Sequence, residues 1–364
     1  MISAKILAQS LFFKMIFPKL NIKDLPSPNA MHDEIKQLRA RFNEPICMAP
    51  TNDCEGGIIK AHTLSVGQML TPISRDGHVY SLKINVYNAT KTDTAAQISL
   101  RGIREISVFR GFCAKHDREL FLPIENRVFT ASAEQIFLHA FRAIAKECYL
   151  KPKGTIQAKR IPELRKNIYN QKYTYITGEE QQYITGSEYG AKDMFLLKKK
   201  MDKLMIRKDF SKLRTVFVSF KRMPDIVCNF VYTPDMDFDD KELQDFNAPS
   251  GKMEHLFVTV SPHTNGGGYL LLSHLGNRKA SNSCRRLIES LLTQPDISSA
   301  IARLVFSRTE NYAISPTWFD SLSPQRKKQI QDAFEIGTIL NPCCTLKNIG
   351  IQVPDWEPQK PVYR

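Results

Sequence analysis

Long apolar segments are missing from this chain of 364 residues. Near the start, Lys5, Gln9 and Lys14 interrupt the hydrophobic residues before any run is long enough to cross a bilayer. The same stretch lacks a basic leader, a continuous apolar core and a small-residue cleavage site in that order. The sequence therefore predicts an amphipathic helix packed on the body of the protein, no membrane span and a cytoplasmic location.

Disulfide bonds are not expected. Without an export signal, the eight cysteines are predicted to remain reduced. In a reducing cytoplasm, spaced cysteines indicate metal binding or core packing more often than a disulfide framework. On the predicted helix that starts near Ser132, Cys148 and His139 are interpreted as core residues.

Acidic residues are too few to balance the basic ones. The chain has 51 Lys and Arg against 37 Asp and Glu, a net charge of +14. Residues 151–214 alone hold sixteen basic and seven acidic residues, +9 of that excess, with tyrosines interleaved. The excess charge favours a polyanionic partner, with nucleic acid first, DNA before RNA, and an anionic membrane surface second. For residues 151–214 themselves, a solvated basic face over an ordinary core is an equally open interpretation. A protein partner or a homo-oligomer is a further expectation.

A phosphate-binding loop is also absent from the glycine-rich segment. Gly266 to Gly268 join two predicted strands and are not followed by Lys-Ser or Lys-Thr. A hairpin turn is the better interpretation, and no internal repeat or low-complexity segment is visible.

The chain has enough apolar residues, 42%, for a sizeable core. The predicted fold class is α+β, with an N-terminal treble-clef zinc module, a basic helical middle and a C-terminal antiparallel sheet with helices. The predicted divisions are 1–45 (helical segment), 46–150 (zinc module with following helix), 151–214 (basic connector) and 215–364 (α+β domain).

Four alternating segments after residue 214 predict strands, at 215–222, 226–234, 255–262 and 267–275. Helices are expected at 281–293, 296–306 and 316–334. In the basic connector, Phe195, Leu196, Leu197 and Met201 are expected to face inward. No chemistry follows from the position of Asn311 before the last of these helices.

Two cysteine pairs carry the strongest signal. Cys47 and Cys54 are separated by six residues that include the turn formers Pro50, Asn52 and Asp53. Cys113 and His116 have the Cys-x-x-His spacing that lets both side chains reach one ion where a turn enters a helix. Together they form a Cys3His set, which indicates a structural Zn²⁺ site. Two alternatives are unrelated cysteines and histidines, or a set in which His62 replaces Cys47.

With the strand segment "IIKAHTL" and the helix start "CAKHD", residues 46–125 resemble the treble-clef zinc form of HNH (ββα-metal) endonucleases. The resemblance places His62 on the general base of that family and Cys113 with His116 on its second zinc pair. Asp117 falls on the position of the last metal-binding histidine. The pattern is also similar to that of uncharacterised bacterial proteins, some of them from antiviral, phage-defence contexts.

The resemblance implies a zinc-stabilised nuclease that hydrolyses phosphodiester bonds with Mg²⁺ or Mn²⁺. His62 would deprotonate water, and Asp117, with Glu119 or Glu125, would supply oxygen ligands to the divalent cation. Asn88, or alternatively Asn85, would orient the imidazole. These roles make His62, Asp117 and Asn88 the expected catalytic residues.

Two departures from the family keep other functions open. Ala61 occupies the position of a metal-binding Asp or His, and the interval from His62 to Cys113 requires an insertion. One alternative is a degenerate HNH module that binds nucleic acid with its zinc but does not cleave it. Another is a zinc module that only supports a protein-interaction scaffold.

Overall fold

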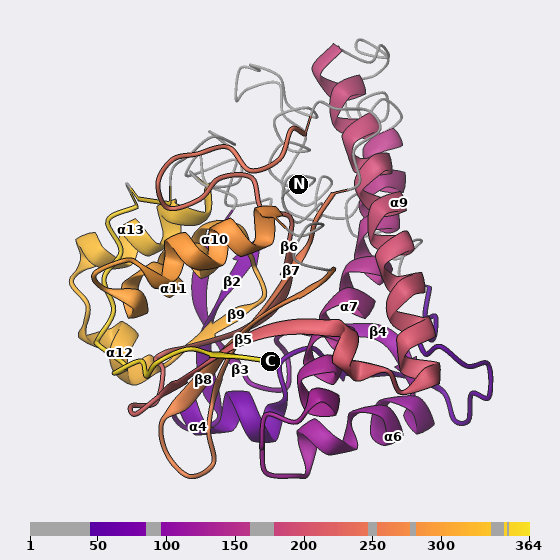
Figure 1. Cartoon of the computed structure of the whole chain (residues 1–364), viewed down its shortest axis with the longest axis horizontal. Coiled ribbons are helices and arrows are strands. Elements are labelled where there is room, and N and C mark those ends of the chain that lie inside the picture. Colours follow the sequence, from indigo (N-terminus) through magenta and orange to yellow (C-terminus); the bar gives the residue numbers. More distant parts are fainter. Residues whose placement is uncertain are drawn as a thin grey trace, which may run out of the picture.

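The computed structural model describes residues 44–84, 96–160, 178–246, 253–276, 282–335, 346–347 and 349–364 (Figure 1). The N-terminal helix expected before residue 45 therefore lies almost wholly outside the described residues. None of the helices in the described segments combines the length and apolar content needed to cross a bilayer.

An eight-stranded antiparallel sheet forms the centre of the protein, in the order β10-β5-β8-β7-β6-β9-β2-β3. Its strands are β2 (His78–Ile84), β3 (Ala96–Gly102), β5 (Leu213–Phe220), β6 (Ile226–Tyr232), β7 (Leu256–Pro262), β8 (Gly268–Leu275), β9 (Tyr312–Ile314) and β10 (Val362–Tyr363). The four strands expected after residue 214 are thus confirmed as β5 to β8. The sheet also includes β2 and β3, so it crosses the division expected at residue 214.

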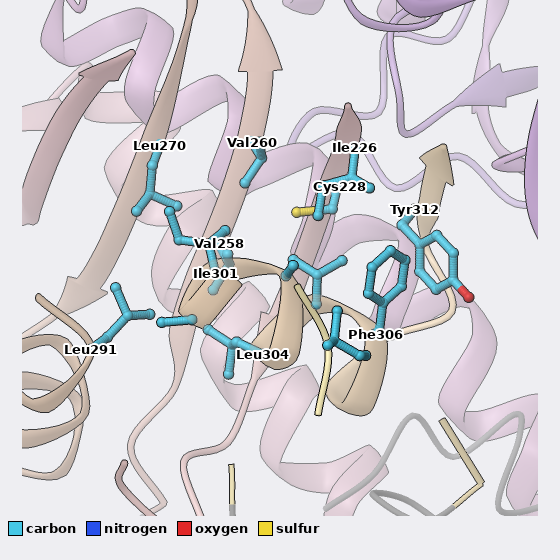
Figure 2. Packing of buried hydrophobic residues seen from close by; sticks show 14 of the residues in the cluster. Ile226, Cys228, Val258, Val260, Leu270, Leu291, Ile301, Leu304, Phe306 and Tyr312 are labelled. Carbon is cyan, nitrogen blue, oxygen red and sulfur yellow. The ribbon is translucent and has the colours of Figure 1, made fainter. Parts of the chain in front are cut away.

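Both faces of the sheet are buried, and alternate residues point to different cores. Val258 and Val260 of β7 pack with the C-terminal helices, as Figure 2 shows, together with Leu270 of β8 and Ile301. Phe257 belongs to the core on the opposite face. Between β7 and β8, the amide of His263 donates to the carbonyl of Gly267, which confirms the hairpin.

Helices α10 (Asn282–Leu292), α11 (Ile297–Arg308), α12 (Pro316–Ser321) and α13 (Pro324–Glu335) cover one face (Figure 1). The single helix expected over 316–334 is two helices. The extended C-cap Leu322 ends α12, and Pro324 begins α13. Proline has no backbone N–H to continue a preceding helix, but it fits the first position of a new one.

The other face is covered by α7 (Ala133–Lys159), and α9 (Gly178–Arg207) packs alongside α7 (Figure 1). His139 and Cys148 of α7 are buried, as expected. On α9, Leu197 and Met201 are also buried, but the inward orientation expected for Phe195 and Leu196 is wrong, since they are 62% and 48% exposed. At about 3.6 residues per turn, residues 197 and 201 share a face from which 195 and 196 are turned away.

A separate two-stranded sheet pairs β1 (Ile58–His62) with β4 (Val108–Cys113), and α6 (Ala114–Glu125) follows β4 directly. The short turns η3 (Val66–Leu70) and α4 (Thr71–Ile73) come after β1, and η4 (Phe210–Lys212) precedes β5. Strands β2 and β3 lie between β1 and β4 in the chain. They are the insertion that the long interval from His62 to Cys113 requires.

Candidate metal centre and adjoining pocket

Four side chains converge where β4 becomes α6. Cys47 and Cys54 come from the loop before β1, Cys113 ends β4, and His116 lies in the first turn of α6. Nδ1 of His116 lies 3.4, 3.7 and 3.3 Å from the Sγ atoms of Cys47, Cys54 and Cys113 respectively. All four ligand atoms lie within 4.8 Å of one another.

This spacing fits a tetrahedral ion. With Zn–S bonds of about 2.3 Å and Zn–N bonds of about 2.0 Å, neighbouring ligand atoms are about 3.5 to 3.8 Å apart. The expected Cys3His cluster is therefore present and could hold a metal ion such as zinc. His62 is not a member of it, so the alternative set without Cys47 is not the one that forms.

Local backbone structure explains how the ligands meet. Ile58 pairs with Cys113 across the two strands, and the amide of Met48 donates to the carbonyl of Gly111. Cys113 is the N-cap of α6, and its Sγ accepts the amide of His116 at 3.5 Å. The Cys-x-x-His spacing therefore places both side chains at the same point of the helix start, as expected from the sequence.

The far nitrogen of the His116 ring has its own partners. Nε2 lies 3.1 Å from both Oδ1 of Asp53 and Oγ1 of Thr51. Nζ of Lys115 donates to Asp53 at 3.0 Å, and the hydrogen bonds from Thr51 and Lys115 hold the pKa of Asp53 well below its usual range. A carboxylate at this position fixes the ring so that Nδ1 faces the thiols. The sequence showed Asp53 only as a turn former.

The acidity of each thiol depends on its neighbours in the cluster. Burial and the adjacent thiols of Cys47 and Cys113 raise the pKa of Cys54 to about 11. Burial acts in the same direction on Cys113, but backbone hydrogen bonds from His116 and Glu55 outweigh it and its pKa falls to about 7. Cys113 therefore ionises more readily than Cys54, and the negative charge of one thiolate opposes ionisation of the next thiol. A divalent cation would remove this opposition and bind all three as thiolates.

A cavity of about 270 Å³ lies beside α6. It is lined by residues from β1, η3, α6 and its C-cap, and α7: His62, Val66, Asp117, Arg118, Leu122, Glu125, Asn126 and Arg142. Asp117 directly follows His116 of the cluster in α6, so the pocket adjoins the cluster. The structure thus brings together two of the three expected catalytic residues, His62 and Asp117. Asn88 and Asn85 lie outside the described residues.

His62 and Asp117 each carry a buried polar atom with no hydrogen-bond partner among the described residues, Nε2 and Oδ1 respectively. Burial lowers the pKa of His62, although a backbone contact with Arg104 opposes the change. Burial raises the pKa of Asp117, and the positive charge of Arg142 opposes that change. His62 is consequently a neutral imidazole near pH 7, in the form that can accept a proton.

The two glutamates suggested as additional oxygen donors differ in position. Glu119 is exposed and pairs with Arg118 at 3.4 Å, and it does not line the pocket. Glu125 does line it, but Oε1 bonds to Nη1 of Arg142 and Oε2 accepts the hydroxyl of Ser65. Both carboxylate oxygens of Glu125 are therefore already engaged.

Ala61, the departure noted in the sequence, is 1% exposed and packs with Phe109 and Phe112. Because neighbouring residues of a strand point to opposite faces, Ala61 and His62 cannot both face the pocket. A carboxylate at position 61 would be buried among aromatic rings, which explains why an apolar residue stands there.

Arg142 is the pocket residue that the sequence interpretation missed. It belongs to the segment of α7 that reads "FLHAFRAIAK", and it is 2% exposed. An arginine within a mostly apolar helical segment was the available signal, since a buried charge generally has a specific partner or function.

Comparison of the chain with known protein families, with curated proteins and with solved structures found no match. Any assignment of function must therefore start from the metal cluster and the pocket.

Proposed function

We propose that this protein is a zinc-stabilised, HNH-like nuclease that hydrolyses phosphodiester bonds in nucleic acid. One observation carries the proposal: His62 and Asp117, each with an unpaired buried polar atom, line one pocket beside the Cys3His cluster. Unpaired buried polar groups are uncommon in proteins, so two of them at one cavity favour a binding or catalytic site.

In this mechanism the chain supplies a base and a carboxylate. Nε2 of His62 accepts a proton from the attacking water, and burial keeps the ring neutral for that task. Oδ1 of Asp117 is the available carboxylate oxygen for Mg²⁺ or Mn²⁺. When bound, the divalent cation supplies Lewis-acid stabilisation of charge at phosphate oxygens. Zn²⁺ in the Cys3His cluster would hold the loop before β1, the end of β4 and the start of α6 together beside the pocket.

The charge distribution supports a nucleic-acid substrate. The net charge of the chain is +14, and α9 carries exposed basic residues from its middle to its C-terminal end. These are Lys192, Lys199, Lys200, Lys203 and Arg207. A cationic surface of this kind attracts a phosphate backbone without reading its sequence. DNA is proposed ahead of RNA, and an anti-phage role and a protein partner remain predictions from the resemblance and composition.

A cleavage comparison tests the proposal. Purified wild type and His62→Ala would be incubated with supercoiled plasmid, linear DNA and RNA, each with Mg²⁺ or Mn²⁺, after their zinc contents are shown to be equal. We expect nicking by the wild type and at least a hundredfold slower nicking by His62→Ala, since general-base catalysis contributes roughly 10²- to 10⁴-fold. Equal rates, or no cleavage of any substrate by the wild type, would contradict the proposal.

The second candidate is a zinc-dependent nucleic-acid-binding protein without nuclease activity. Ala61 and the engaged oxygens of Glu125 favour it, because they leave few ligands for a catalytic cation. It predicts oligonucleotide binding that weakens steeply with salt and no cleavage under any metal condition.

A further inference from the structure

The buried guanidinium of Arg142 is only partly neutralised. Nη1 pairs with Oε1 of Glu125, and the guanidinium carbon lies 4.0 Å from the centre of the Phe121 ring. Nε is buried and has no acceptor among the described residues. A donor that is buried without an acceptor costs free energy, so its retention in a cavity wall favours an anionic ligand.

The negative charge around Arg142 is limited. Glu125 divides its interactions between Arg142 and the hydroxyl of Ser65, and Nε2 of Gln68 donates to the Glu125 carbonyl at 2.8 Å. These contacts hold the carboxylate at the pocket wall. Asp117 is the other carboxylate that lines the cavity, and its Oδ1 does not bond to Arg142.

A divalent cation in this pocket would also have few protein ligands. Position 61 contributes none, because Ala61 points into the apolar core, and Glu125 is already engaged. His62 and Asp117 remain. With so few ligands for metal ions, part of the positive charge in this pocket comes from the fixed guanidinium of Arg142.

We propose that Arg142 is the phosphate-binding residue of this pocket, and that the Nε edge of its guanidinium donates to a nonbridging oxygen of the substrate phosphate. Arginine suits this role because its planar, permanently charged donors match phosphate oxygens. In this arrangement Glu125 is a positioning residue that holds Arg142 and does not bind the catalytic metal. The inference rests on the proposed function for the class of substrate, a phosphodiester.

Binding measured without cleavage tests the role of Arg142. Fluorescence anisotropy of labelled DNA and RNA oligonucleotides would be recorded with Ca²⁺ in place of Mg²⁺ for four proteins: wild type, Arg142→Gln, Arg142→Lys and Arg110→Gln. Arg110, an exposed residue of β4, is a matched control that removes the same charge away from the pocket. Zinc content and thermal unfolding establish that each variant is folded, and Arg142→Lys preserves the charge if Arg142→Gln is unstable.

We expect Arg142→Gln to weaken binding by roughly ten- to hundredfold, the effect of one charged hydrogen bond. Arg142→Lys should restore part of the affinity, and Arg110→Gln should change it only a few-fold. Inorganic phosphate should compete more weakly for the oligonucleotide site in Arg142→Gln than in wild type. Equal binding by Arg142→Gln and Arg110→Gln would overturn the inference.

The Glu125→Gln variant separates positioning from metal binding. We expect its half-maximal Mg²⁺ concentration for cleavage to match that of the wild type, with oligonucleotide affinity lower than in the wild type because Arg142 loses the ion pair that holds it. A Mg²⁺ requirement raised tenfold would make Glu125 a metal ligand and overturn the inference. Absence of cleavage by the wild type would refute the proposed function alone, since the binding comparison still decides the role of Arg142. No binding by the wild type at low salt would refute both.

Discussion

Oδ1 of Asp53 lies 3.1 Å from Nε2 of His116, on the nitrogen that does not face the three thiols. This contact orients the imidazole and favours the tautomer in which Nδ1 can bind a metal ion. It comes from a loop residue in the interval between Cys47 and Cys54, so the unusually long spacing of that pair has a structural purpose.

Asp53→Ala is expected to weaken zinc binding about ten- to a hundredfold while leaving the four ligands in place. Glu55→Ala is the matched control, because Glu55 also pairs with Lys115, at 2.7 Å, but has no contact with His116. Competition with a chromophoric zinc chelator measures both affinities. Equal zinc affinities of the two variants would show that Asp53 does not support the metal site.

Cys113→Ser is expected to remove zinc from the purified protein and to lower its melting temperature, because an ion in the cluster would connect β4, α6 and the loop before β1. A strong chelator should have the same effect on the wild type. Cys148→Ser is the control, since Cys148 is a buried thiol of α7 outside the cluster. Elemental analysis should find about one zinc per chain in the wild type and in Cys148→Ser. Retention of zinc by Cys113→Ser would contradict the assignment.

The pH dependence of cleavage should reflect His62. Burial lowers its pKa from the ordinary value of 6.5, Arg142 lowers it further, and Glu125 together with the backbone contact to Arg104 acts in the opposite direction. The acid limb of kcat/KM should therefore lie below pH 6.5. Arg142→Gln should move this limb to higher pH, and Glu125→Gln should move it to lower pH. If Arg142→Gln moved the limb to lower pH, or Glu125→Gln moved it to higher pH, a group other than His62 would be titrating.

The same shift has a consequence for stability. Because the folded pKa of His62 is lowered, the unfolded state binds the proton more readily. The contribution of His62 to the free energy of unfolding is complete above pH 6.5. It is lost as the pH falls from there toward the folded pKa. Urea unfolding as a function of pH should show a smaller loss on acidification in His62→Gln than in the wild type.

Asp117→Asn should raise the Mg²⁺ concentration needed for half-maximal cleavage by at least tenfold, since it replaces a charged oxygen ligand with a neutral one. Asp239→Asn, at an exposed position outside the pocket, provides the control for the change in net charge. Titration of cleavage rate against Mg²⁺ measures the effect. An unchanged requirement in Asp117→Asn would remove Asp117 from the set of metal ligands.

Asn311 connects the large sheet to the strand that carries His62. Its Oδ1 accepts from Ser107 at 2.7 Å and from Lys146 at 2.5 Å, and its Nδ2 donates to the carbonyl of Asn229 at 2.6 Å. Ser107 in turn accepts the amide of Leu64, two residues after His62. Asn311 therefore has a structural role that the sequence did not reveal.

Asn311→Ala is expected to lower the free energy of unfolding by roughly 2 to 3 kcal/mol, because it leaves several buried polar groups without partners. Asn282→Ala, at the exposed start of α10, should change it by about 0.5 kcal/mol or less. Chemical denaturation measures both variants. Similar values for the two would indicate that the buried network adjusts without cost.

The Cys113–His116 half of the cluster could be predicted because its geometry is local. A cysteine at the end of a strand and a histidine three residues later meet at the start of the following helix, whatever the rest of the chain does. The strands β5 to β8 were predictable for a similar reason, since the alternation of apolar residues persists through each one. Asp53, by contrast, has no such pattern, and its role depends on how the loop closes over His116.

Two features depended on contacts between distant parts of the chain. Strands β2 and β3 join the large sheet through β9, a pairing of segments more than two hundred residues apart that no local pattern encodes. Arg142 reaches the pocket because α7 packs against α6, which brings it to Glu125, 17 residues earlier.

The sequence by itself determined the members of the Cys3His cluster, the α+β class and the excess of positive charge, since residue type and short spacing specify these properties. Only the tertiary structure decided that His62, Asp117 and Arg142 share one pocket, because three separate elements must pack together before their side chains can meet. It also decided that Ala61 faces the core and supplies no metal ligand. In the proposed site, Arg142 therefore supplies part of the positive charge for the phosphate.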